Sequence, residues 1–119
     1  MGDSKEFMLG YLIGIRYTDG CIYTEGGSER NPGRKFDLQA IDEEMVEYTA
    51  KCLNDVFGRN VHIRIRKRKT SANNEVYQCS TMVKKIEKGL NLKNIKTKEN
   101  MKGCICVLIG QVLDMIVLA

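Results

Sequence analysis

The feature that most constrains the fold is an apolar segment near the N-terminus that contains two glycines and ends on Asp-Gly. Residues 9–20 read Leu-Gly-Tyr-Leu-Ile-Gly-Ile-Arg-Tyr-Thr-Asp-Gly. The apolar positions are spaced as in an α-helix, and Gly10 and Gly14 leave a strip without side chains along one face. Because each glycine costs a helix about 1 kcal/mol relative to alanine, the strip predicts close contact with a second helix. Asp19 would then lie at the foot of the helix, beside whatever the second helix contributes.

The rest of the chain predicts a small α+β domain. Asp3 and Glu6 have the spacing of a capping box ahead of the first helix, and Asp42 and Gly58 suit the two ends of another. The expected elements are a helix over residues 4–18, strands over 21–24 and 35–41, a helix over 43–57, strands over 61–69 and 76–79, and a helix from Ser80 or Thr81 to about Leu90. This order is typical of an α+β fold with an antiparallel sheet.

The segment 61–69 is the clearest strand signal. Val61, Ile63 and Ile65 alternate with side chains that would share the opposite face, namely His62, Arg64, Arg66 and Arg68. A strand with so many basic residues on one face favours a phosphate backbone as its partner. The alternative is an edge strand whose charges are simply solvated and discourage aggregation.

Composition and charge narrow the class further. The chain has 119 residues, enough for one hydrophobic core, and no tryptophan. Residues 1–57 carry a net charge of −5 and residues 58–119 a net charge of +9, so the basic character is concentrated in the second half. Five scattered cysteines, with no signal peptide ahead of them, indicate free thiols and a cytoplasmic protein.

Residues 12–20, together with this order of elements, resemble the LAGLIDADG motif and core of the homing endonucleases. The resemblance covers roughly residues 6–92 and implies an αββαββα domain with a curved, antiparallel four-stranded sheet. In that family two such helices pack together at a two-fold axis, and the sheet lies in the DNA major groove. Arg16 and Tyr17 depart from the motif, which usually has an apolar and a small or acidic residue there.

The resemblance implies which side chains face double-stranded DNA. A major groove about 12 Å wide admits a two-stranded ribbon, so alternate side chains can reach base edges. On this model the DNA-binding residues are Tyr23, Glu25, Lys35, Asp37, Gln39, His62, Arg64, Arg66 and Arg68. Arginine to guanine and glutamine to adenine are the natural bidentate contacts.

The resemblance also implies a catalytic site. Asp19 takes the place of the aspartate that binds a divalent cation, Mg²⁺ or Mn²⁺, over the scissile phosphates. Asp42 matches the polar residue at the end of the second strand, although it is equally well explained as a helix cap. Lys84 lies near the family's lysine at the start of the third helix. Two metal ions at such a site would activate water and stabilise the leaving oxygen.

With a single motif, the family resemblance implies a homodimer. Gly10, Ile13 and Gly14 would form the helix contact at the dimer axis. A two-fold protein reads a palindromic or pseudo-palindromic DNA site.

The C-terminal segment lies outside the resemblance. The chain therefore divides into a core over residues 1–92 and a segment over 93–119, which has a basic connector and a strongly apolar end. The apolar stretch is too short for a comfortable membrane span. It is expected to be a helix or strand that packs on the core or on a partner chain.

These patterns favour a metal-dependent, site-specific DNA endonuclease. The runner-up is a DNA-binding relative that has lost cleavage and acts as a regulator or splicing cofactor. A third possibility is an interaction module that binds no nucleic acid.

Overall fold

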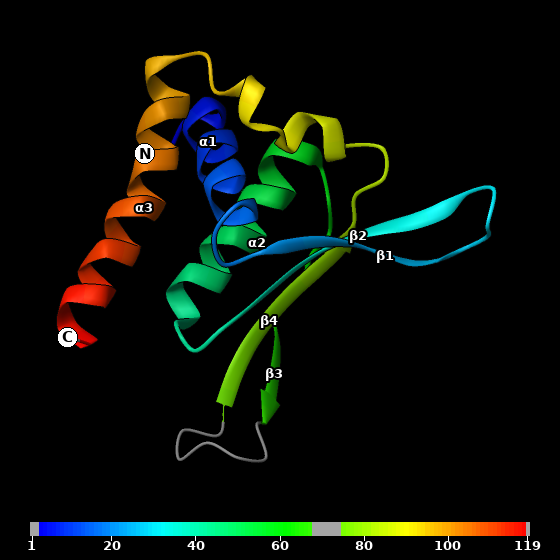
Figure 1. Cartoon of the computed structure of the whole chain (residues 1–119), viewed down its shortest axis with the longest axis horizontal. Coiled ribbons are helices and arrows are strands. Elements are labelled where there is room, and N and C mark those ends of the chain that lie inside the picture. The colour runs from blue at the N-terminus through cyan, green and yellow to red at the C-terminus, as the bar shows by residue number, and fades with distance from the viewer. Residues whose placement is uncertain (1–2, 68–74, 119) are drawn as a thin grey trace.

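The computed structural model describes the backbone of residues 3–67 and 75–118, and side chains over 3–66 and 75–110. Three long helices lie on one side of a four-stranded antiparallel sheet (Figure 1). The elements are α1 (Lys5–Arg16), β1 (Cys21–Gly27), β2 (Pro32–Ala40), α2 (Glu43–Phe57), β3 (Arg64–Lys67), β4 (Glu75–Met82), two short 3-10 helices (Glu87–Leu90 and Leu92–Asn94) and α3 (Lys98–Leu118). The predicted α+β class and antiparallel sheet are confirmed.

The strands are ordered β1-β2-β4-β3, so the two hairpins meet where β2 pairs with β4. Phe36, Leu38 and Cys79 lie on the face that packs against the helices, and all three are buried. The alternation in β2 thus puts apolar side chains under the helices and polar ones on the opposite face.

The helix α2 has the predicted bounds. Asp42 Oδ1 accepts a hydrogen bond from the Met45 backbone N–H at 3.4 Å, and Gly58 ends the helix with a φ of 65°. A left-handed residue of this kind is the usual helix terminator, and glycine adopts it without strain. The N-terminus of α1 differs from the prediction, because Ser4 rather than Asp3 is its N-cap. Asp3 instead accepts a hydrogen bond from the Tyr48 hydroxyl.

One predicted element is wrong and another is confirmed only in part, as β3 (Arg64–Lys67), with residues 68 and 69 outside the described part of the chain. No α-helix begins at Ser80 or Thr81, because both residues continue β4 and pair with Asp37 and Phe36 of β2. Of the strand predicted over 61–69, residues 64–67 form β3, and Val61 is not paired with β4. Its backbone N–H donates to Asn54 Oδ1 of α2 at 2.7 Å, which ties this segment to the helix.

The apolar C-terminal segment forms α3, which packs along α1 of the same chain (Figure 1). Val107 of α3 is buried with Met8, Leu12 and Ile15 of α1 in the main hydrophobic core. Within the described part of the chain, no helix has the length and apolarity needed to cross a membrane.

Candidate functional site

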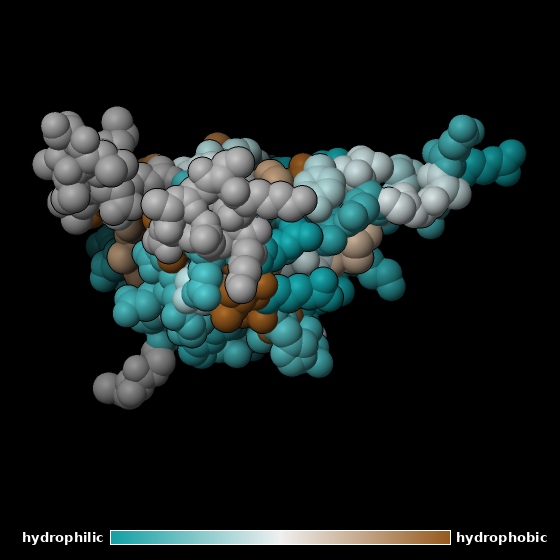
Figure 2. Space-filling view, turned by 90° about the horizontal axis from the view of Figure 1, so that it is seen from below, coloured by the Kyte–Doolittle hydropathy of each residue, from teal (hydrophilic) through white to brown (hydrophobic). Residues whose placement is uncertain are grey.

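The face of the sheet that the helices leave uncovered carries rows of polar side chains. Strand register places Tyr23 beside Lys35, and Asp37 between Cys21 and Ser80. A further row crosses three strands, from Gln39 through Gln78 to Arg64. We call this surface the open face and define it by Tyr23, Lys35, Asp37, Gln39, Arg64, Arg66, Gln78 and Ser80. Seen from below, the coloured part of the molecule is largely hydrophilic, out along the β1–β2 hairpin (Figure 2).

Asp37 organises the middle of the open face. Its carboxylate accepts hydrogen bonds from Gln39 Nε2 at 3.1 Å and from Gln78 Nε2 at 2.5 Å, and the residue is only 8% exposed. The predicted DNA contact of Asp37 is therefore replaced by an internal one, since both carboxylate oxygens are occupied by neighbours. Gln78 is as buried as Asp37, whereas Gln39 is exposed and keeps its amide oxygen and one N–H for an external partner.

Gln78 was missed by sequence reasoning. Its strand was expected, but only the pairing of β2 with β4 brings Gln78 directly beside Gln39. The signal was available in principle, because residues two apart in a strand share a face. The sequence alone could not show which alternate residues of β4 point toward the helices and which point to the open face.

The other predicted DNA-facing residues are spread over the sheet and its edges. Arg64 and Arg66 of β3 are exposed, as is His62 just before that strand. Glu25 forms an ion pair with Lys35, with 2.8 Å between Oε2 and Nζ. The hydrogen bond that Lys35 donates to this carboxylate raises the pKa of Lys35, so the lysine charge already has a partner. Arg68 lies outside the described residues.

The glycine strip of α1 faces α3 of the same chain, not a second copy. A Cβ added at Gly10 would lie 1.9 Å from the Asn100 carbonyl oxygen, and one at Gly14 would lie 3.2 Å from Val107. Ile13, also predicted at the dimer axis, is fully buried within the chain. The close helix contact that the glycines predicted is thus made intramolecularly, and this corrects the dimer interface expected from Gly10, Ile13 and Gly14.

The contact between α1 and α3 has local two-fold symmetry. Gly10 lies against Asn100, and reciprocally a Cβ at Gly103 would lie 2.0 Å from the Phe7 carbonyl oxygen. Phe7 therefore corresponds to Asn100 and Gly10 to Gly103, with a constant offset of 93 residues. In backbone position, α3 is the partner helix that the LAGLIDADG resemblance implied for α1.

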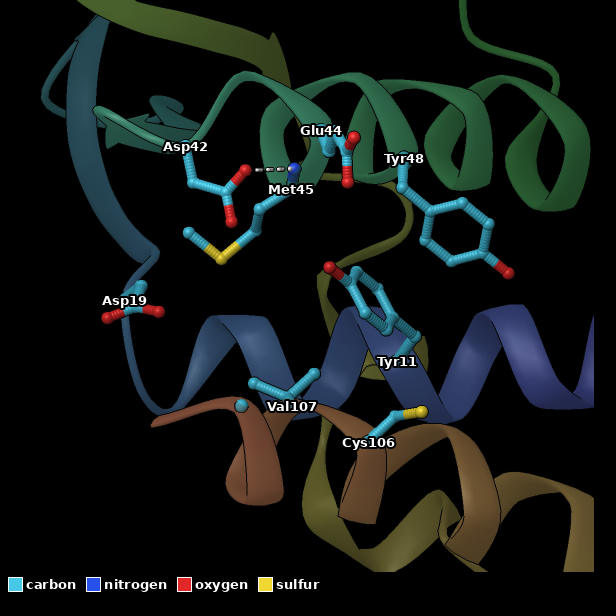
Figure 3. A pocket seen from close by; sticks show the side chains of 9 residues that line it. Tyr11, Asp19, Asp42, Glu44, Met45, Tyr48, Cys106 and Val107 are labelled. Carbon is cyan, nitrogen blue, oxygen red and sulfur yellow. Dashed lines mark hydrogen bonds between the residues drawn. The ribbon is translucent and has the colours of Figure 1, made fainter. Parts of the chain in front are cut away.

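A pocket of about 470 Å³ opens at the foot of this helix pair. It is lined by Tyr11, Asp19, Asp42, Glu44, Met45, Tyr48, Cys106, Val107 and Gly110. Asp19 lies in the turn after α1, and Asp42 extends from the start of α2 toward α1 (Figure 3). Two of the three predicted catalytic residues thus share one pocket, and Glu44 joins them without having been predicted.

The turn that carries Asp19 is held by backbone contacts. The Gly20 N–H donates to the Ile15 carbonyl at 2.7 Å, and Thr18 Oγ1 donates to the Gly14 carbonyl at 2.7 Å. These bonds satisfy carbonyls at the end of α1 that have no partner within the helix. They leave the Asp19 residue exposed at the pocket.

Lys84 is exposed beyond the end of β4 and is not among the residues that line the pocket. The basic residue that does act near the foot of α1 is Arg16. It lies 3.7 Å from Glu87 Oε1, and Glu87 also binds Arg34 through two hydrogen bonds of 2.9 and 3.1 Å. These bonds from Arg34 lower the pKa of Glu87. Arg16, which departs from the family motif, therefore ties α1 to the 3-10 helix that begins at Glu87, and Glu87 in turn binds Arg34 of β2.

The donor set does not amount to a complete metal site. Over the residues that the structure describes, no three His, Cys, Asp or Glu side chains are grouped so that they could hold a metal ion. α1 ends at Arg16, and Asp19 lies in the turn that follows, whereas α3 continues as a helix to Leu118. The two-fold correspondence of the helices therefore does not extend to Asp19.

This arrangement is that of a LAGLIDADG-like fold, and comparison with solved structures shows the same class. The chain is similar to a variant of I-DmoI bound to nicked target DNA with manganese, with a TM-score of 0.60, 16% identity and coverage of 87% of this chain and 59% of that one. A second I-DmoI variant, bound to target DNA with magnesium, gives a TM-score of 0.61 at 18% identity and covers 87% and 60%.

Structures of mesophilic variants of the homing endonuclease I-DmoI match with a TM-score of 0.59 at 17% identity, covering 87% of this chain and 56% of theirs. The chain thus spans about three fifths of the length of the proteins it resembles. No protein-family model and no curated protein matches the sequence. The fold is therefore established by shape, at an identity too low to transfer an activity.

Proposed function

We propose that this chain binds double-stranded DNA site-specifically through the open face of its sheet. The observation that carries the proposal is the row Gln39, Gln78 and Arg64 across three adjacent strands, in which Gln39 and Arg64 are exposed and the buried Gln78 lies between them. Amide and guanidinium groups are the side chains best suited to bidentate contacts with adenine and guanine. Asp37 fixes the two amides before DNA arrives, which lowers the entropic cost of ordering them on binding.

The charge distribution supports the same partner. Arg64 and Arg66 are exposed on β3, and the half of the chain that contains them carries the positive excess. Of the acidic residues near the sheet, Glu25 is paired with the cationic Lys35. Asp37 keeps its negative charge, because its two partners are neutral amides, but the residue is only 8% exposed. The exposed charges of β3 therefore set the sign of the field that a polyanion meets there.

A matched pair of double variants tests DNA binding. Arg64→Gln with Arg66→Gln removes two charges from the open face, whereas Lys93→Gln with Lys98→Gln removes two exposed charges beyond the sheet. We expect the first variant to lose at least ~10-fold in affinity and to reduce the salt slope by about 2. The second variant should bind like the wild type. Equal losses in both variants would show that binding is unspecific attraction to net charge.

Cleavage is a second candidate function, favoured by the exposed Asp19 at the foot of the helix pair and by Asp42 in the same pocket. In a competent site, Mg²⁺ or Mn²⁺ would supply an activated water and neutralise the leaving oxygen. Among the described side chains, no three potential ligands are grouped so that they could hold such an ion. Of the two functions, we therefore propose DNA binding without cleavage.

The test of cleavage is incubation of a bound duplex with Mg²⁺ or Mn²⁺, using Asp19→Asn as the control. We expect no nicking by either protein and equal DNA affinity. Nicking by the wild type that disappears in Asp19→Asn would restore the endonuclease as the function of this chain.

The helix contact also bears on assembly. Since α3 fills the glycine strip of α1, a homodimer built on that strip would have to displace α3. We propose that one chain presents one sheet to DNA, and that its preferred site is not palindromic.

A further inference from the structure

The segment that connects the sheet to α3 carries a second run of positive charge. Between Glu87 and Glu99 the sequence has no acidic residue, and its basic residues are four lysines, all of them exposed. We call this set the lysine surface and define it by Lys88, Lys93, Lys96 and Lys98. The segment crosses the end of the helix layer that lies opposite the β3–β4 hairpin (Figure 1). The lysine surface is therefore separate from the basic residues of β3.

The acidic side chains next to these lysines in the sequence do not neutralise them. Glu87 is used within the chain, where it pairs with Arg34 and Arg16. Glu99 pairs with Lys102, almost one helical turn further along α3. Among the ion pairs of the described residues, none includes a member of the lysine surface. The four ammonium groups thus present their full charge to solvent.

The backbone beneath the lysines is held by hydrogen bonds. Asn94 Nδ2 donates to the Lys88 carbonyl at 2.7 Å, which closes the turn between the two 3-10 helices. At the start of α3, Asn100 Nδ2 donates to the Glu6 carbonyl of α1 at 2.6 Å. The lysines therefore extend from an ordered backbone, and a ligand that binds them need not order the chain first.

Two of the lysines stand where a helix disfavours them. α3 begins at Lys98, and Thr97 Oγ1 accepts a hydrogen bond from the Asn100 backbone N–H at 3.1 Å. The N-terminal end of a helix carries partial positive charge, so acidic side chains stabilise it and lysines do not. Lys96 and Lys98 flank Thr97 nevertheless. A local choice that works against the helix is expected at functional surfaces, and here the lysines and the helix dipole together favour an anion.

We propose that the lysine surface binds the phosphate backbone of a second segment of duplex DNA while the open face holds the first. The inference rests on the proposed function for the first segment only. Between Glu87 and Glu99 there is neither an arginine nor an aromatic residue. The surface is therefore suited to contacts with phosphates, and it offers no aromatic ring on which the bases of a single strand could stack.

The second segment is not the DNA that directly flanks the first. The chain measures 41 × 37 × 26 Å, and the lysine surface lies at the end of the molecule away from the β3–β4 hairpin (Figure 1). Duplex DNA has a persistence length of about 50 nm, so a short flank would have to bend sharply to pass around a body of this size. The chain would instead bridge two duplexes, or two distant parts of one.

Capture of one duplex by another tests the bridge. Wild-type protein is bound to a bead-linked duplex that carries its preferred site, and a fluorescent duplex of unrelated sequence is then added at low salt. We expect the fluorescent duplex to be captured, and capture to fall steeply as the salt concentration rises. The variant Lys93→Gln, Lys96→Gln, Lys98→Gln should stay on the beads, because the open face holds it there, and should capture at least ~10-fold less. Arginine at the same three positions should restore capture, since phosphate contacts need only the charge.

A matched variant controls for net charge. Lys5→Gln, Lys51→Gln and Lys85→Gln remove three exposed charges outside the lysine surface, and this protein should capture the fluorescent duplex like the wild type. The variant Arg64→Gln, Arg66→Gln reports on the open face. If it stays on the beads as well as the wild type does, the open face is not the first site. The lysine surface is then judged by direct titration with the fluorescent duplex, in which the three glutamines should reduce the salt slope by about 3.

Two results would overturn the proposal in either experiment. One is binding of the fluorescent duplex by the lysine-surface variant that equals that of the wild type, or that falls no further than in the matched control. The other is stronger binding of single-stranded RNA of the same length than of the duplex, which would make RNA the occupant of the lysine surface.

Discussion

The open face of the sheet and the foot of the helix pair are equipped very differently. On the open face, Asp37 holds two glutamines in place and Arg64 continues their row. At the helix foot, Asp19 is exposed, while Asp42 already has a structural role as a helix cap. The difference teaches that the two surfaces are built from separate parts of this fold, so the proposed recognition of DNA does not depend on the pocket that holds Asp19.

The largest effect, on the stability of the fold, is expected at the contact between α1 and α3, which forms the helix pair above the Asp19 pocket. Gly10→Ala would place a methyl group against the Asn100 backbone, which can yield only if α1 and α3 separate. We expect a loss of about 3 kcal/mol in the free energy of unfolding, measured by urea denaturation. Gly110→Ala, where a Cβ meets nothing within 4 Å, should be neutral or stabilising by up to ~1 kcal/mol. Equal effects would mean that α3 does not pack on the glycine strip.

The next largest effect is expected on the open face, where the loss of Asp37 should weaken discrimination between DNA sequences. Asp37→Ala frees Gln39 and Gln78 from their shared acceptor. We expect discrimination between the best DNA site and a singly substituted site to fall by about 1–3 kcal/mol, because the amides are no longer fixed. Affinity for unrelated DNA should change little. Competition binding with the two duplexes measures both quantities, and unchanged discrimination would remove Asp37 from the recognition surface.

A smaller effect should appear at the helix foot, in the network of Arg16, Arg34 and Glu87. The pKa of Glu87 is lowered below its ordinary value of 4.5 by Arg34, so the ionised carboxylate stabilises the folded state above that pH. This contribution is lost as the pH falls through the lowered pKa. Glu87→Gln should therefore be less stable than the wild type at neutral pH, and the difference should shrink in thermal melts below about pH 4.5. A difference that stays constant with pH would exclude the charge as its origin.

Local signals in the sequence predicted much of this molecule. Asp42 and Gly58 fixed the ends of α2, and the glycines of α1 predicted a close helix partner. The identity of that partner could not be predicted, because the contacts between α1 and α3 join residues far apart in the sequence, such as Gly10 with Asn100 and Gly103 with Phe7. Likewise, Ser80 and Thr81 suit a helix cap in isolation, and only pairing with β2 keeps them in a strand.

The candidate site was also predicted only in part from the sequence. Alternation along β2 and β3 was enough to suggest Lys35, Gln39, Arg64 and Arg66 as one surface. It could not show that Asp37 is occupied by two glutamines, since Gln78 comes from another strand. Nor could the motif at Asp19 show that Asp42 and Glu44 of another helix line the same pocket, because that depends on how the two helices pack.

The most direct test of DNA recognition by the open face is selection of bound duplexes from a randomised pool by the wild type and by a Gln39→Ala, Gln78→Ala variant. We expect the wild type to enrich a defined, non-palindromic motif and the variant to lose preference at particular base positions within it. No enriched motif, or the same motif in both proteins, would contradict recognition through the open face.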